Sequence, residues 1–175
     1  MSNLRLIKEV SISSTVAHIN VENVFTNDFN VYQIVSYGFQ KSSSGGANVS
    51  LRLINSSGTV IADDYAGALY NLKSNTGYSD GNRSTDTAQV YFYFGRAGTS
   101  GSTTGQQGYI FHPFDADKMT FGTYMNQYDN DNISPEGGKA IFSYNRIARI
   151  TGFQARMESA TMNQGKILVY GLRED

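Results

Sequence analysis

The sequence contains no cysteine, which excludes disulfide bonds, thiolate metal sites and cysteine nucleophiles. It contains no run that approaches the roughly 20 consecutive apolar residues needed to span a bilayer, so we expect no membrane partner. Its 14 Lys and Arg residues nearly balance its 15 Asp and Glu residues. Because binding to a polyanion needs a basic surface, we expect no nucleic-acid partner. Tryptophan is also absent, which weakens the case for a sugar-stacking platform.

Charged residues interrupt the apolar ones throughout residues 1–9, so the N-terminus does not have the apolar core of a secretory signal peptide. Neither end of the sequence carries a lipidation motif. We therefore expect the chain to be made as a soluble protein in the cytoplasm.

A length of 175 residues suits one domain, residues 1–175, which buries enough surface to fold without a disulfide, metal or cofactor. Only 17% of the residues are charged, while 13% are aromatic and 18 are glycine. This composition is typical of a β-rich domain with polar loops.

Apolar and polar residues alternate along most of the chain, as they do in half-buried strands. Between Phe29 and Phe39 every second residue forms one face, and Val49, Leu51 and Leu53 form another. The turn-forming residues 55–58 then predict a hairpin, in which Gly58 adopts a positive φ. Further strand candidates are residues 4–12, 19–24, 59–62, 89–94, 109–111, 119–125, 140–150 and 166–172.

No window of the sequence shows a sustained helical period. The pattern predicts an all-β fold, a single antiparallel β-sandwich of the jelly-roll type. Three long polar loops are expected at residues 71–88, 96–108 and 126–139. Loops of this length are uncommon unless they are functional or disordered, so we expect them to cover one end of the sandwich or to reach a neighbouring chain.

Residues 90–94 read Val-Tyr-Phe-Tyr-Phe. As a strand, this segment places Val90, Phe92 and Phe94 in the core and Tyr91 and Tyr93 on the outer face. Tyrosine suits a surface that is partly covered, so a second subunit, a loop of the same chain or a ligand should cover these two rings. We favour Tyr91 and Tyr93 as residues of an oligomer interface.

We find no catalytic residues and no metal site in the sequence. His18 and His112 do not have the spacing of zinc ligands, so we expect structural or surface roles for them. Residues 129–132 resemble the start of a calcium loop but lack its later ligands, although a cation site built from several loops stays open for Asp115, Asp117, Asp129 and Asp131. The carboxylate pairs that glycoside hydrolysis would need are Asp63 with Asp64 and Asp115 with Asp117. Adjacent residues of a strand point to opposite faces, so Asp63 and Asp64 converge only if the backbone turns there.

Three arginines, Arg146, Arg149 and Arg156, lie near the aromatic residues Phe142, Tyr144 and Phe153. Sheets of this kind can stack single-stranded nucleic acid. Because the chain has no net positive charge, a polar sheet face or salt bridges at a subunit contact are the better interpretation.

Two segments carry a resemblance to a known group of proteins. Residues 147–154, Ile-Ala-Arg-Ile-Thr-Gly-Phe-Gln, are followed by residues 165–172, Gly-Lys-Ile-Leu-Val-Tyr-Gly-Leu. This order resembles the closing hairpin of structural proteins of tailed bacteriophages, including phages of marine cyanobacteria. Residues 24–32 and the strand Val-Ser-Leu-Arg-Leu at 49–53 are similar to the N-terminal pattern of the same group.

The resemblance implies a non-enzymatic virion structural protein with a β-sandwich fold, located on a tail fibre, baseplate or capsid surface. It implies assembly with other virion proteins and with copies of itself, as a homo-oligomer and most often a trimer. No coiled-coil or collagen-like shaft precedes the sandwich, which favours a tail-attached knob or a capsid decoration protein over a complete fibre.

The alternative function is a carbohydrate- or receptor-binding module that contacts polysaccharide on the host cell. Its candidate contact residues are the loop tyrosines Tyr70, Tyr78 and Tyr128. A glycan-cleaving enzyme is a more distant third interpretation, because it needs two carboxylates facing each other across a groove.

Overall fold

The computed structural model describes residues 3–42, 47–74, 77–91, 93–98, 104–129 and 135–173, and for residues 78–86 and Asp129 it describes the backbone alone. Over these ranges the protein is all-β and contains no helix. Accordingly, this part of the chain has no helix of the length and apolar character required to cross a membrane.

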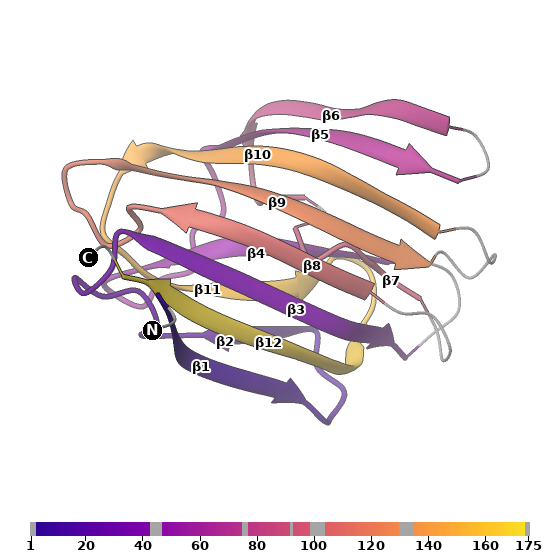
Figure 1. Cartoon of the computed structure of the whole chain (residues 1–175), viewed down its shortest axis with the longest axis horizontal. Coiled ribbons are helices and arrows are strands. Elements are labelled where there is room, and N and C mark those ends of the chain that lie inside the picture. Colours follow the sequence, from indigo (N-terminus) through magenta and orange to yellow (C-terminus); the bar gives the residue numbers. More distant parts are fainter. Residues whose placement is uncertain are drawn as a thin grey trace.

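Eight strands form one large antiparallel sheet, in the order β1-β12-β3-β8-β9-β10-β5-β6. In the view of Figure 1 they lie side by side from bottom to top. Their bounds are Leu4–Ile12 for β1, Met162–Leu172 for β12, Val31–Lys41 for β3, Thr104–Phe111 for β8, Met119–Asp129 for β9, Pro135–Ile147 for β10, Tyr65–Lys73 for β5 and Gly77–Thr87 for β6.

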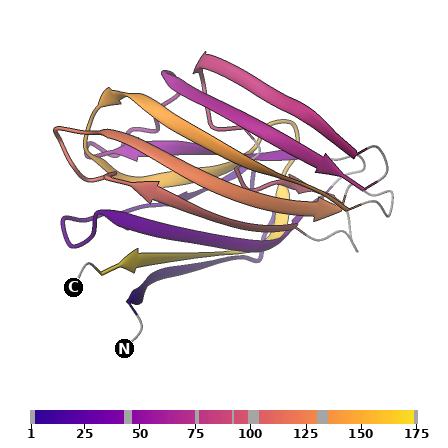
Figure 2. The ribbon, with the colours of Figure 1, turned by 45° about the horizontal axis from the view of Figure 1, so that its top comes forward.

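Four strands form a smaller sheet, in the order β2-β11-β4-β7. They are β2 (His18–Val21), β11 (Ile150–Met157), β4 (Ala47–Asn55) and β7 (Arg96–Ala97). This sheet lies behind the large one in Figure 1, and the two layers are separated in Figure 2. The predicted all-β sandwich of antiparallel strands is therefore confirmed.

Alternation along the strands decides which side chains enter the space between the sheets. In β9, exposed and buried residues alternate from Met119 to Tyr128. In β4, Val49, Leu51 and Leu53 are fully buried. The inner faces of both sheets contribute to one hydrophobic cluster.

Aromatic rings join the two layers inside this cluster. The Phe94 ring lies 6.0 Å from the ring of Phe153 on the small sheet and 5.7 Å from that of Phe39 on the large sheet. The ring of Tyr93 lies 4.8 Å from Tyr124 and 5.8 Å from Phe142, both on the large sheet. Rings at these separations pack favourably edge to face or offset.

The three segments predicted as long polar loops are for the most part strands, so that prediction is wrong. Residues 71–73 form the end of β5 and residues 77–87 form β6, residues 104–108 begin β8, and the described parts of 126–139 extend β9 and β10. The reason is that backbone hydrogen bonds between neighbouring strands do not require apolar side chains. These strands continue past the core, where the apolar alternation that revealed the other strands is no longer needed.

Two predicted strands are shorter than expected. Residues 59–62 keep only a bridge between Ile54 and Val60, although Gly58 does adopt the predicted positive φ of 79°. In segment 89–94, Val90 bridges to Leu51 and the chain then turns. Phe92 lies outside the described residues.

Candidate functional site

The outer face of the large sheet carries an unusual set of exposed side chains. Six large apolar or aromatic residues on β3, β5, β9 and β10 are between 40% and 61% exposed, and we call them the apolar face: Tyr37, Tyr70, Leu72, Phe121, Met125 and Ile141. An antiparallel sheet that faces water normally presents polar residues there. Met119 and Ile147, paired with each other at the ends of β9 and β10, extend this exposure.

The strand register aligns the residues of this face in rows that cross the sheet. Tyr109, Thr123, Ile141 and Ala68 are successive partners across β8, β9, β10 and β5. The next row consists of Gln107, Met125, Lys139 and Tyr70. Residues that are far apart in the sequence thus form one continuous surface.

These two rows line a hollow of about 560 Å³, a size within the usual range of small-ligand sites. Its polar groups are the amide of Gln107, the hydroxyls of Tyr70, Tyr109 and Thr123, and the ammonium group of Lys139. Gln33 Nε2 donates a hydrogen bond to the Tyr109 hydroxyl at 3.2 Å and so helps to orient that ring. Lys139 is the one charged side chain among the described residues that line the hollow.

A second hollow of about 630 Å³ continues toward the ends of β9 and β10 and shares Met125 and Lys139 with the first. Gly137 and Gly77 contribute to its lining without side chains. At the opposite end of the first hollow, Phe111 and Phe121 stack with ring centroids 4.8 Å apart and an angle of 16° between the rings. The face is therefore a shallow groove with aromatic residues at one end.

The prediction that Tyr91 and Tyr93 share an outer face is wrong for Tyr93, which is fully buried. Because the chain turns after Val90, side chains no longer alternate between faces, and Tyr93 and Phe94 both enter the core. Burial raises the pKa of Tyr93. Tyr91 is half-buried, and its carbonyl accepts a hydrogen bond from the Tyr124 hydroxyl at 2.7 Å. A place for Tyr91 in an oligomer contact stays a prediction.

Of the three tyrosines predicted to contact a ligand, Tyr70 lines the groove. Tyr128 lies in β9 rather than in a loop, is only 4% exposed, and donates a hydrogen bond to Glu136 at 3.2 Å. Burial, with the nearby charge of Glu136, raises the pKa of Tyr128 to about 12. The side chain of Tyr78 lies outside the described residues.

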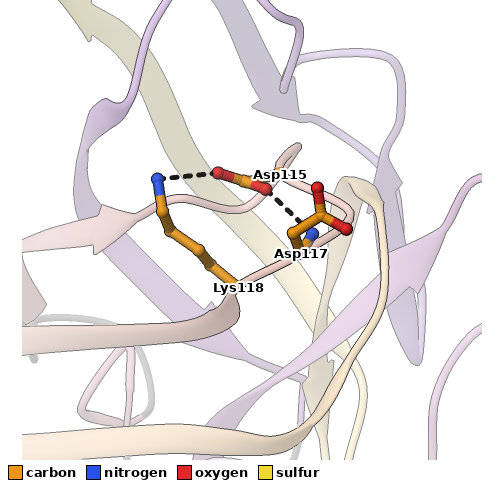
Figure 3. A network of polar contacts seen from close by, with 3 residues as sticks. All are labelled: Asp115, Asp117 and Lys118. Carbon is orange, nitrogen blue, oxygen red and sulfur yellow. Dashed lines mark hydrogen bonds and ion pairs between the residues drawn. The ribbon is translucent and has the colours of Figure 1, made fainter.

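The predicted cation-site residue Asp115 makes contacts with residues close to it in the sequence. The Asp115 carboxylate accepts hydrogen bonds from the Lys118 ammonium group and from the backbone N–H of Asp117, each at 2.9 Å (Figure 3). These contacts lower the pKa of Asp115. Asp131 and the side chain of Asp129 lie outside the described residues, and no group of three His, Asp or Glu residues suited to a metal occurs in the described part.

The backbone does turn at the other carboxylate pair, since Asp64 has a φ of 60°. Asp64 accepts a hydrogen bond from the guanidinium group of Arg146, while Asp63 is exposed. Neither carboxylate lines the groove of the large sheet. The described groove thus lacks the facing carboxylates that glycoside hydrolysis requires.

The three predicted arginines do not share one surface. Arg146 pairs with Asp64, Arg149 lies 4.9 Å above the Phe114 ring, and Arg156 lies on the small sheet. The aromatic residues expected beside them, Phe142, Tyr144 and Phe153, are buried and cannot stack on a nucleotide base. His18 is exposed in β2, and His112 is half-buried, with a φ of 52°.

The sequence pattern was not used to predict the groove, although it contains a signal for one. Large side chains occur on both faces of residues 119–125, with Met119, Phe121 and Met125 on one face and Tyr124 on the other. A strand that is apolar on both faces needs a cover on both.

No family model matches this chain, and no curated protein matches its sequence. Among solved structures, it is similar to the PL-14 alginate lyase from Aplysia kurodai, at 10% identity and a TM-score of 0.34, over 90% of this chain and 82% of the lyase. It is also similar to the CBM2 module of the evolved Dit protein of Lactobacillus casei BL23 phage J-1, at 9% identity and a TM-score of 0.26, over 90% of this chain and 69% of the module.

A further similarity is to the structure of infectious bursal disease virus, Gx strain, at 11% identity and a TM-score of 0.17. It covers 98% of this chain but only 41% of the viral one. At these TM-scores none of the three similarities supports an assignment of function.

Proposed function

We propose that this chain is a non-enzymatic structural protein of a bacteriophage particle, and that it associates with copies of itself through the apolar face. The observation that carries the proposal is the set of six large side chains left 40% to 61% exposed, one on β3 and five on the adjacent strands β9, β10 and β5. Contiguous apolar patches of this kind mark surfaces that contact another protein. The phage context is supported by the resemblance of residues 147–154 and 165–172, which form parts of β10, β11 and β12.

The composition of the face is that of a subunit contact. Aromatic residues and methionine are enriched at protein interfaces, and charged residues are depleted at their centres. Covering the exposed half of a Leu, Ile, Met or Phe side chain yields about 1 kcal/mol. With the two tyrosines counted alike, six such side chains on each of two subunits yield on the order of 12 kcal/mol. Against the lowest estimate of the cost of association, about 4 kcal/mol, this leaves about 8 kcal/mol, which corresponds to association at about micromolar concentrations.

A second copy of the chain is the proposed occupant because the charges beside the groove are mixed. Glu136, Lys73 and Lys139 all line its second hollow. In a symmetric contact the same patch faces itself, so the carboxylate of one copy can approach an ammonium group of the other. This contact alone gives a homodimer, and the trimer implied by the resemblance stays a prediction, because a three-fold ring needs heterologous contacts between two different patches.

The test is sedimentation of wild type, Ile141→Asp and Met125→Asp at concentrations up to tens of micromolar. Each substitution places a carboxylate in the centre of the contact, so both variants should sediment as monomers while wild type forms oligomers. Ser13→Asp adds the same charge at an exposed position away from the face and should behave like wild type. A monomeric wild type throughout this range would refute self-association.

The second candidate function is a module that binds host-cell polysaccharide in the same groove. The observation in its favour is the set of polar groups in the hollow, where Tyr70 is the register partner of Lys139 and Gln107 lies at the other end of the same row. Sugars are commonly bound by aromatic rings together with a few directed hydrogen bonds.

A glycan array separates this function from the first. Tyr70→Ala and Gln107→Ala should each abolish binding, whereas Tyr37→Ala, an exposed tyrosine that does not line the hollow, should not. Absence of binding to any glycan and to whole host cells would remove this candidate.

A further inference from the structure

The outer face of the small sheet is polar throughout, in contrast to the outer face of the large sheet. Its strands present one set of side chains that we call the arginine face: His18, Asn20, Asn48, Ser50, Arg52, Gln154 and Arg156. None of the exposed large apolar residues of the described chain belongs to β2, β4, β7 or β11.

Two arginines lie diagonally across the middle of this face. Arg52 on β4 is the register partner of Gln154, and Arg156 on β11 is the partner of Ser50. Side chains in diagonal positions are within reach of each other when they are long. Burial lowers the pKa of Arg52, and the neighbouring positive charge of Arg156 lowers it further. The fold therefore holds two like charges together, which is unfavourable in the absence of an anion.

The described chain supplies no anion to this pair. Its ion pairs join Lys118 to Asp115, Arg146 to Asp64, and Lys166 to Glu9. The Nε atoms of Arg52 and Arg156 are buried without a hydrogen-bond partner.

Glu158 lies near the face but is bound by neutral donors. Its Oε1 accepts hydrogen bonds from the Ser50 hydroxyl at 2.8 Å and from Gln89 Nε2 at 2.6 Å. No ion pair joins Glu158 to Arg52 or Arg156 in the described structure. The two guanidinium groups thus keep their capacity to bind a carboxylate in a bidentate manner.

We propose that the Arg52–Arg156 pair binds the carboxylate groups of an acidic polysaccharide. A bidentate contact with each guanidinium group fixes the charge. The exposed His18 then presents a hydrogen-bonding group to sugar hydroxyls. The amides of Asn20 and Asn48 donate to the carboxylates of Glu22 and Glu158, at 3.2 Å and 3.5 Å. Gln154 is the register partner of both Asn20 and Arg52, and its Nε2 donates a hydrogen bond of 2.9 Å to Asn20 Oδ1.

The surroundings of the pair favour a polysaccharide over the other polyanions. An acidic peptide needs apolar pockets for its anchoring side chains, and the described arginine face has none. Single-stranded nucleic acid needs exposed aromatic rings on which bases stack. The arginine-face residues include no Phe, Tyr or Trp, and of the two tyrosines near Arg52, Tyr65 is buried and Tyr91 is half-buried. This inference concerns the opposite side of the sandwich from the apolar face and does not depend on the proposed self-association.

The test measures binding of polygalacturonate to the full chain at low salt, by calorimetry, for wild type, Arg52→Gln, Arg156→Gln and the double variant. Loss of one charged hydrogen-bonding group should weaken binding by about tenfold, and the double variant should not bind. Arg149→Gln removes the same charge at a distant, exposed position and should bind like wild type. Melting curves show whether each variant is folded. Arg156→Lys keeps the positive charge, so it replaces Arg156→Gln in the comparison if Arg156→Gln does not fold.

Three further probes distinguish the ligand classes. Neutral dextran should not bind, and poly-glutamate and an oligo-thymidine strand should bind more weakly than polygalacturonate. Equal or tighter binding of poly-glutamate or oligo-thymidine would overturn the assignment to a polysaccharide. No binding of polygalacturonate, or equal binding by wild type and the folded double variant, would overturn the site itself.

Discussion

Gly122, in the middle of β9, offers the sharpest test of how the two faces of the large sheet are built. A Cβ atom added there would lie 2.4 Å from Cε1 of Phe142 and 2.5 Å from the carbonyl oxygen of Tyr109. The Phe142 ring belongs to the core, and the Tyr109 carbonyl belongs to the neighbouring strand β8. Neither group can move away without disturbing the packing between the sheets.

We expect Gly122→Ala to destabilise the protein by about 1–3 kcal/mol, the usual cost of inserting a methyl group into a packed core. For a domain of this size, each kcal/mol lowers the melting temperature by about 2–4 °C. The expected decrease is therefore roughly 2–12 °C, measured by circular dichroism or calorimetry.

Gly105 in β8 is the matched control, because a Cβ atom there would have nothing within 4 Å. Gly105→Ala should change the stability by less than about 0.5 kcal/mol. Equal melting temperatures for Gly122→Ala and Gly105→Ala would show that Phe142 does not pack against β9 as described, and the layered arrangement of the inner face would need revision.

Three other predictions concern single side chains. Tyr65→Phe removes a buried hydroxyl that accepts from the Leu53 N–H at 2.7 Å and donates to the Ile61 carbonyl at 3.2 Å, so denaturant unfolding should show a loss of about 1–3 kcal/mol, and an unchanged midpoint would contradict these bonds. Gly58→Ala forces a β-carbon into a backbone with a φ of 79° and should cost about 1–2 kcal/mol in the free energy of unfolding. Ser56→Ala, at an exposed position of the same turn, serves for comparison and should change it by less than about 0.5 kcal/mol. The pKa of Tyr128 rises from 10.0 to about 12 in the folded state, so its contribution to stability is complete below pH 10 and is lost as the pH rises toward 12. Melting temperatures should therefore fall above about pH 10, and the loss should be smaller in Tyr128→Phe; identical alkaline profiles for the two proteins would refute this role.

Local pattern was sufficient for the fold class and for most of the regular strands. The alternation in residues 4–12 predicted β1, and that in residues 49–53 lies within β4. In β4 the requirement to bury every second side chain determines the residue types. In β1 only Ile7, Val10 and Ile12 pack against the core, while Leu4 and Leu6 are exposed. The positive φ of Gly58 was also predictable, because the hairpin turn needs it.

The sequence pattern predicted loops where the structure has strands β5 and β6 and the outer ends of β9 and β10. These strands pair through backbone hydrogen bonds, which require no particular type of side chain. Segment 89–94 was mistaken for a regular strand, because alternation alone cannot reveal that the chain turns after Val90 and buries Tyr93.

The candidate sites depend on which strands become neighbours, and that was decided by the tertiary structure. The groove needs β5 beside β10, which brings Tyr70 next to Lys139 across a separation of about seventy residues. The arginine face needs β11 beside β4, which places Arg156 diagonal to Arg52. The amino-acid sequence thus determined which residues are apolar, polar or charged and that they lie on alternating strands. Only the order and register of those strands determined which of them share a surface, because contacts between distant segments depend on the packing of the whole chain.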